Sequence, residues 1–138
     1  MEALRTIFDG VEYRSRLEAR FAEFLRSQCV SFDYEPGFWL DCHTGITYVP
    51  DFFLGPLDLA IEVKPLAFLS EINVLWDDIM RTGVRWICVD QLERGHWSII
   101  GRRFNFYPGV TIPVSNVVSF HWTDDRELLL EINGLYFA

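Results

Sequence analysis

The chain has 138 residues, of which 50% are hydrophobic and 16% aromatic. That apolar content supports a folded domain with a core and argues against intrinsic disorder. The formal net charge is −8, which argues against a protein that coats nucleic acid through a basic surface. The negative charge is compatible with a protein whose carboxylates bind a cation.

No secretory signal is expected at the start of this sequence. The first ten residues carry three charged side chains and no apolar run, and nowhere do eighteen uncharged apolar residues follow one another, so we expect a cytoplasmic protein with no membrane partner. The three cysteines, Cys29, Cys42 and Cys88, have no CxxC spacing, and we expect reduced structural thiols. A second metal site is not expected, because His43, His96 and His121 have no regular spacing with one another or with cysteine.

A helix is the first element expected. Apolar residues at 17, 21, 24 and 25 follow a helical stripe, and Ser15 precedes it as a good N-cap. Extended segments follow over 30–34 and 37–40, separated at Glu35-Pro36 because proline disfavours helix at the residue before it. A turn over 41–45 leads into the next strand.

A β-hairpin is expected next, from strands over 46–53 and 59–64 around the turn Gly55-Pro56-Leu57-Asp58. An amphipathic helix over 66–81 ends at Gly83. The remaining expected strands are 84–90, 96–101, 114–121 and 128–136. This order predicts an α/β fold, a mixed central sheet flanked by helices, in a single domain over 1–138 with its core at about 13–101 and a β-rich C-terminal extension at about 102–138.

The hairpin brings two carboxylates together. If it is symmetric about the Pro56–Leu57 bond, Asp51 lies directly across from Glu62. Opposed residues have Cβ atoms roughly 4.5 to 5.5 Å apart, where like charges repel unless a cation lies between them. Oxygen ligands without Cys or His favour Mg²⁺ or Mn²⁺ over zinc.

The only lysine of the chain lies in the second strand of this expected hairpin. Of twelve cationic residues eleven are arginine, and the exception is Lys64 in a strand with apolar flanks. Strand alternation puts Lys64 on the same face as Glu62. Its ammonium can therefore orient a metal-activated water and stabilise charge on a phosphate.

These residues resemble a known family. Pro50-Asp51, then ten residues, then Glu62-Val63-Lys64 is similar to the signature of the PD-(D/E)xK nuclease superfamily, and Glu18 resembles the acidic residue that many members add from their first helix. The resemblance spans about residues 13 to 90 and is nearest to small phage- and prophage-type members, more distantly to transposon endonuclease subunits. It implies an αβββαβ restriction-endonuclease-like core that cleaves DNA, or sometimes RNA, with magnesium.

The resemblance also implies a role for each site residue. Asp51 and Glu62 would be metal ligands, the Val63 carbonyl a further one, Lys64 the catalytic lysine, and Glu18 a ligand directly or through water. One feature departs from the exonuclease branch: the helix after Lys64 lacks a Gln-containing motif and offers Glu71 and Asn73 instead.

Simpler interpretations stay open for several residues. Ser15-x-x-Glu18 is also a capping box, in which the glutamate serves only the helix end. Glu35 fits an exposed turn residue or an added site carboxylate. Exposed arginines either grip DNA phosphates or are simply solvated, and these are Arg14, Arg16, Arg20 and the pair Arg102-Arg103.

The sequence therefore predicts a metal-dependent DNA endonuclease, of phage, mobile-element or defence origin. The alternative is a nuclease-fold binding or assembly module whose cleavage is weak or lost in a larger nucleoprotein complex. A third function is a carboxylate metalloenzyme acting on small phosphate esters. Apolar C-terminal strands could also leave an edge that pairs with a second subunit.

Overall fold

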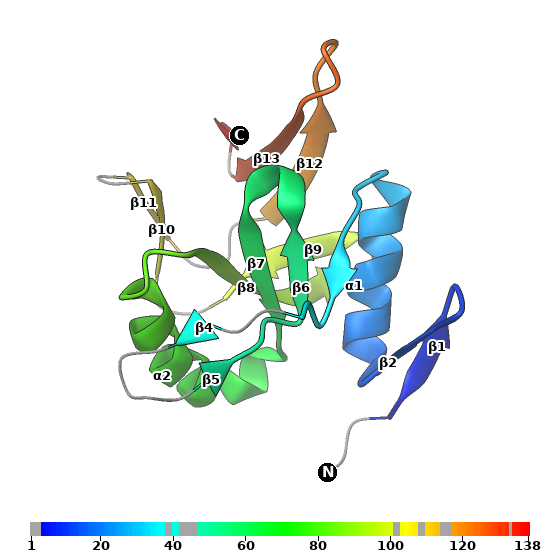
Figure 1. Cartoon of the computed structure of the whole chain (residues 1–138), viewed down its shortest axis with the longest axis vertical. Helices are drawn as coiled ribbons and strands as arrows, with labels where there is room; N and C mark the ends of the chain where they lie inside the picture. The colour runs from blue at the N-terminus through cyan, green and yellow to red at the C-terminus, as the bar shows by residue number, and fades with distance from the viewer. Residues whose placement is uncertain are drawn as a thin grey trace.

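The computed structural model describes residues 4–37, 40–41, 47–100, 103–107, 110–113, 117–132 and 134–138. Within them the chain is mixed α/β, with two α-helices and an eight-stranded mixed sheet in the order β14-β13-β12-β9-β8-β7-β6-β3 (Figure 1). The sheet strands are β3 (Asp33–Tyr34), β6 (Phe52–Leu54), β7 (Leu59–Val63), β8 (Arg85–Glu93), β9 (His96–Ile99), β12 (Val117–Trp122), β13 (Leu128–Ile132) and β14 (Leu135–Phe137).

Three antiparallel strand pairs lie outside this sheet in the described part of the chain. They are β1 (Thr6–Phe8) with β2 (Val11–Tyr13), β4 (Leu40–Asp41) with β5 (Thr47–Tyr48), and β10 (Arg103–Tyr107) with β11 (Val110–Pro113). The β1–β2 pair turns at Asp9-Gly10, both with positive φ, as a tight two-residue turn requires. Neither it nor the β10–β11 pair was among the expected elements.

The two helices cover opposite faces of the sheet (Figure 1). Helix α1 (Arg16–Ser27) packs on one face through Phe21 and Leu25, which lie in one core cluster with Phe52 and Ile61. Helix α2 (Leu69–Met80) packs on the other face, where Ile72 and Ile79 share a second cluster with Tyr48, Ala60 and Trp86. Residues of β7 thus alternate between the two cores, as a strand buried on both faces requires.

The register predicted for the hairpin is confirmed. Phe52 pairs with Ile61, Phe53 with Ala60 and Leu54 with Leu59. The connection is a 3-10 turn, η1 (Gly55–Leu57), followed by Asp58 with φ 49°.

The long strand expected over 46–53 is wrong, because the described chain forms β5 and β6 with a break over 49–51. Proline has no N–H to donate to a sheet, so Pro50 interrupts the ladder. The break frees Asp51 from strand pairing and puts it just before β6.

Both expected helices exist. Ser15 is the N-cap of α1, and its hydroxyl accepts the Glu18 N–H. The helix expected over 66–81 begins as a 3-10 turn, η2 (Leu66–Phe68), and α2 then ends at Met80. Gly83 follows with φ 78°, the left-handed conformation that glycine adopts without strain.

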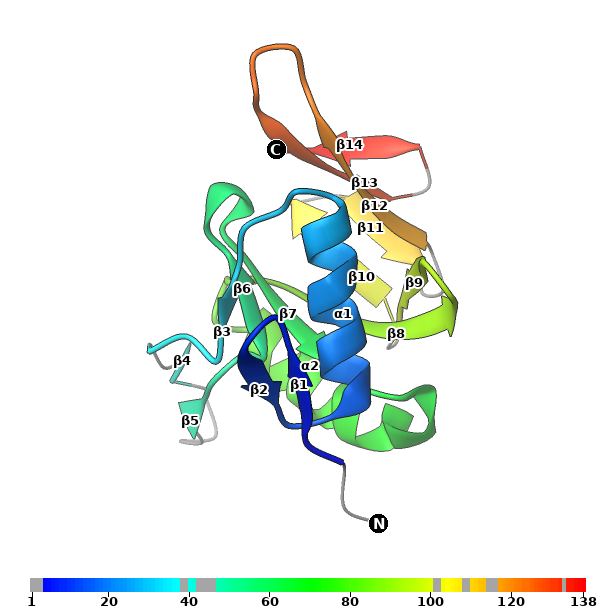
Figure 2. The same ribbon diagram turned by 90° about the vertical axis from the view of Figure 1, so that its right-hand side faces the viewer.

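The C-terminal strands are part of the central sheet. β12 pairs with β9, β13 pairs with β12, and β14 pairs with β13. These three C-terminal strands lie at the top of the view in Figure 2. The single strand expected over 128–136 is wrong, because the chain reverses near Gly134, which has φ 81°, and returns as β14. Figure 2 also shows α1 in front of the sheet.

Several expectations fall outside the described residues. Cys42, His43, Arg102, most of the 41–45 turn and residues 114–116 of an expected strand lie there. Within the described residues, Cys29 and Cys88 are free thiols, as expected. No helix among them is long and apolar enough to cross a membrane.

Candidate metal centre

Glu62 is a buried carboxylate near the end of β7, with a side chain only 6% exposed. The Tyr48 hydroxyl donates a hydrogen bond to Glu62 Oε2, and Trp86 Nε1 donates to the Tyr48 oxygen over 3.2 Å. Tyr48 is itself buried. A carboxylate on the α2 face of the sheet is thereby held in one orientation by two aromatic side chains from other strands.

Asp51 lies beside Glu62, as the hairpin register predicts. Its Oδ2 accepts the Val63 N–H over 2.9 Å, and its backbone oxygen accepts the Glu35 N–H over 2.8 Å. The Asp51 carboxylate therefore faces the peptide that joins Glu62 to Val63.

The pKa values of both carboxyl groups are raised by this arrangement. For Asp51 the pKa lies well above its usual value, first because the group is buried and then because Glu62 and Glu18 are negative nearby. Burial also raises the pKa of Glu62, while the Tyr48 hydrogen bond and the Lys64 charge lower it. Two buried carboxylates that resist ionisation lack compensating positive charge, and a divalent cation supplies such charge.

Glu18 lies near this pair and also serves the helix end. Its Oε1 accepts from the Tyr34 hydroxyl over 3.0 Å and its Oε2 from the Ser15 hydroxyl over 2.9 Å. The side chain is 6% exposed, and its charge raises the pKa values of Asp51 and Glu62. Half of the expected capping box is present, because the Ser15 hydroxyl accepts the Glu18 N–H, but the glutamate contacts that hydroxyl and not the Ser15 backbone N–H. The carboxylate also acts electrostatically on the other two.

Lys64 follows Glu62 on the same strand face. Its charge lowers the pKa values of Asp51 and Glu62. The ammonium lies 3.9 Å from Glu71 Oε2 and 5.8 Å from the centre of the Phe68 ring. The backbone N–H of Lys64 donates to the Val89 oxygen over 3.1 Å, which fixes the start of its side chain against β8.

The donor set fits a partly hydrated hard cation. Among the described residues, no three Asp, Glu, His or Cys side chains come close enough together to hold a metal, so a closed protein cage is absent from that part of the chain. Mg²⁺ is commonly bound by one or two carboxylates, with water and substrate phosphate completing the shell. Asp51 and Glu62 supply those two carboxylates, and the roles of Val63 and Glu18 as further ligands stay predictions.

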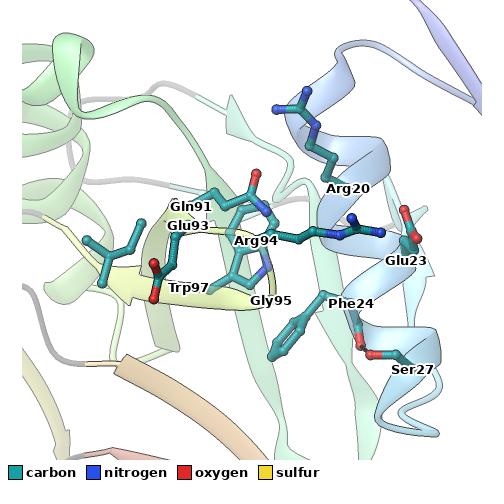
Figure 3. Close-up of a pocket in the computed structure, with 10 residues that line it drawn as sticks. Arg20, Glu23, Phe24, Ser27, Gln91, Glu93, Arg94, Gly95 and Trp97 are labelled. Carbon is teal, nitrogen blue, oxygen red and sulfur yellow. Dashed lines mark hydrogen bonds between the residues drawn. The ribbon is translucent and has the colours of Figure 1, made fainter.

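The three arginines expected at the substrate do not act as one cluster. Arg14 forms an ion pair with Glu35, with Nε 2.5 Å from Oε1, and lines an open hollow together with Asp51. Arg16 is exposed on the first turn of α1. Arg20 faces a different hollow, between α1 and the β8–β9 turn, across from Arg94 (Figure 3).

The hollow in Figure 3 is the larger of the two, about 530 Å³, but Glu18, Asp51, Glu62 and Lys64 do not line it. Its floor holds the buried Trp97, whose Nε1 has no hydrogen-bond partner among the described residues. The candidate centre therefore lies away from this hollow and beside the one that Arg14 and Asp51 line.

Sequence reasoning missed Tyr48 and Tyr34, whose hydroxyls donate to Glu62 and Glu18, and Trp86, which donates to the Tyr48 oxygen. Tyr48 and Trp86 are 38 residues apart, and no local pattern links them. Glu35 pairs with Arg14 and lines the same hollow as Asp51, and both interpretations of this residue stay predictions.

Comparison of the chain with known proteins does not identify the function of this site. No protein-family model, no curated protein and no solved structure matches the chain significantly.

Proposed function

We propose that this chain is a metal-dependent nuclease that hydrolyses phosphodiester bonds of DNA. The observation that carries the proposal is the convergence of Asp51 and Glu62, with raised pKa values, next to the only lysine of the chain. The order α1, β3, β6, β7, α2, β8 supports it further. With β7 and β8 parallel, this order agrees with the αβββαβ core of PD-(D/E)xK nucleases.

The residues have separable roles in this function. Asp51 and Glu62 would hold Mg²⁺ or Mn²⁺ through oxygen, with the Val63 carbonyl and Glu18 as further donors. When bound, the cation supplies Lewis acidity toward the phosphate and lowers the pKa of its water. The Lys64 ammonium, 3.9 Å from Glu71, orients the attacking water and stabilises negative charge that develops on the phosphate oxygens.

A second candidate is a nuclease-fold binding or assembly module with weak or lost cleavage. Two observations favour it: the net charge of −8, and a described carboxylate cluster that does not close into a three-residue metal site. A partner that supplies basic surface would then hold the nucleic acid.

Cleavage assays separate the candidates. Purified protein is incubated with supercoiled plasmid, linear duplex and single-stranded DNA, with Mg²⁺, with Mn²⁺ or with chelator. We expect cation-dependent cleavage that Lys64→Ala removes and that Arg81→Ala, an exposed control at the C-cap of α2, retains. Equal nicking by wild type and Lys64→Ala would indicate contamination and contradict the proposal. A folded, metal-binding wild type that cuts nothing would favour the binding module.

A further inference from the structure

We propose that the site acts on unpaired strands, with Phe68 as a platform on which one base stacks beside Lys64. This inference rests on the proposed nuclease function and names its substrate class. It comes from an exposed aromatic ring next to the lysine.

Phe68 is one of several exposed aromatic side chains in the described part of the chain, with Trp122 and Tyr136, and it lies next to Lys64. The Phe68 side chain is 45% exposed, whereas Phe21, Phe52, Trp86 and Trp97 are at most 1% exposed. Covering the exposed part of the ring would gain only a fraction of the roughly 1.5 to 3 kcal/mol that full burial of such a side chain contributes. Single exposed apolar residues are common on protein surfaces, so the significance of this ring lies in its location beside Lys64.

The ring lies close to the lysine. The centre of the Phe68 ring lies 5.8 Å from Lys64 Nζ. Its turn is tied down at both ends, because the Phe68 N–H donates to the Pro65 oxygen over 2.9 Å and the Leu66 N–H donates to Asp90 Oδ2 over 2.8 Å. The backbone of the turn that carries the ring is thus held before any substrate binds.

That separation suits one nucleotide. A base and its phosphate are joined by a single sugar, so a base stacked on Phe68 brings an adjacent phosphate to the Lys64 ammonium. Stacking on an aromatic side chain contributes roughly 1 to 3 kcal/mol per base and tolerates any sequence. Bases inside a duplex have both faces covered by their neighbours and must be extruded first.

The local charge also favours a single strand. Glu71, which pairs with Lys64, has a side chain that is 60% exposed, and the chain as a whole carries −8. A duplex brings two phosphate backbones toward this acidic surface, while a single strand brings one and gains the stacking contact.

The test compares a short single-stranded oligodeoxynucleotide with its duplex, by fluorescence anisotropy in Ca²⁺ and by cleavage rates in Mg²⁺. We expect the wild type to bind the single strand more tightly than the duplex. Phe68→Ala should lose about tenfold in affinity for the single strand, which equals ~1.4 kcal/mol. Phe68→Trp should bind the single strand nearly as well as the wild type. The matched control is Leu66→Ala, an apolar residue of the same turn with 56% exposure, for which we expect less than about a twofold change.

Each outcome decides the inference. Equal losses for Phe68→Ala and Leu66→Ala, an unchanged affinity for Phe68→Ala, or preferred binding and cleavage of the duplex would overturn it, and the first result would point to a protein-docking surface. Phe68-dependent single-strand binding by a wild type that cuts no substrate would support the platform and contradict the nuclease proposal.

Discussion

A hydrogen-bonded chain of side chains keeps a buried carboxylate in place on β7. Trp86 Nε1 donates to the Tyr48 oxygen, and Tyr48 donates to Glu62. A buried carboxylate without such partners costs several kcal/mol. Tyr48 is therefore a positioning residue for the candidate ligand, and its hydroxyl is satisfied on both sides.

Replacing Tyr48 by Phe should destabilise the protein by ~1 to 3 kcal/mol, because both Trp86 Nε1 and Glu62 lose their partner in a buried site. Urea unfolding measures the loss. The control is Tyr136→Phe, at a position 58% exposed on β14, which should change stability by less than about 0.5 kcal/mol. Equal stabilities of the two variants would show that the buried hydroxyl contributes nothing.

The raised pKa values predict how the metal-free protein responds to pH. The folded-state pKa of Asp51 lies well above its ordinary value of 3.8, so the folded state holds the proton more tightly than the unfolded state. Its stability contribution is therefore full below that ordinary value and is lost as the pH rises through the folded-state pKa.

In chelator, the stability of Asp51→Asn relative to wild type should accordingly increase from about pH 4 to pH 8, by at least ~1 kcal/mol. The amide oxygen of Asn still accepts the Val63 N–H, so the variant isolates the charge. Thermal or urea unfolding across this range measures the difference. A difference that is flat, or that falls with pH, would contradict the electrostatic account.

The sequence predicted one half of the candidate centre and not the other. Hairpin symmetry placed Asp51 beside Glu62 because cross-strand register follows from the turn. Tyr48 lies on β5, outside the eight-stranded sheet, and Trp86 lies on β8 within it, so the two side chains meet only in the packed core. Their roles depend on tertiary packing, which local spacing does not encode.

Helix α1 connects the cap of its first turn to the carboxylate cluster. The Ser15 hydroxyl accepts the Glu18 N–H over 3.1 Å and donates to Glu18 Oε2. Farther along, Phe21 packs edge-on against Phe52 and Trp97, with ring centres 5.2 and 4.9 Å apart. The N-cap fixes the orientation of the Glu18 side chain, and the packed apolar face fixes the position of the helix on the sheet.

Ser15→Ala should cost ~1 kcal/mol of stability, because one N-terminal N–H loses its side-chain acceptor. Urea unfolding measures it, with Ser70→Ala, an exposed residue early in α2, as the control. We expect the control to stay within about 0.5 kcal/mol of wild type. No difference between the two variants would show that the cap contributes nothing to α1.

Element prediction succeeded where one pattern dominated the segment. The helical stripe predicted α1, and the turn residues predicted the β6–β7 hairpin. It failed where a breaker lies inside an apolar run, as at Pro50 and Gly134. The β1–β2 pair had a usable signal, since Asp-Gly between apolar residues favours a tight hairpin.

At the scale of the whole molecule, acidic charge limits how phosphate is held. Of the twelve cationic residues, Arg5, Arg14 and Arg26 already form ion pairs with Glu12, Glu35 and Asp9. The 12 cationic residues are also outnumbered by 20 acidic ones, so we expect few phosphate contacts and little release of counterions from a nucleic acid.

The salt dependence of binding should be shallow. In Ca²⁺, the slope of log K against log salt for single-stranded DNA should correspond to about one to three phosphate contacts, since each contributes roughly −0.7. Fluorescence anisotropy over a range of salt concentrations measures it. A slope equivalent to six or more contacts, at about −4 or steeper, would require a basic surface that the charge balance does not predict.

The most direct test of the central claim is calorimetric titration of the metal-free protein with Mn²⁺ at neutral pH, for wild type and Asp51→Asn. We expect the wild type to bind the ion and Asp51→Asn to bind it at least about tenfold more weakly, as loss of a charged ligand predicts. Absence of binding to a folded wild type, or equal affinity of the two proteins, would contradict a metal centre built on Asp51 and Glu62.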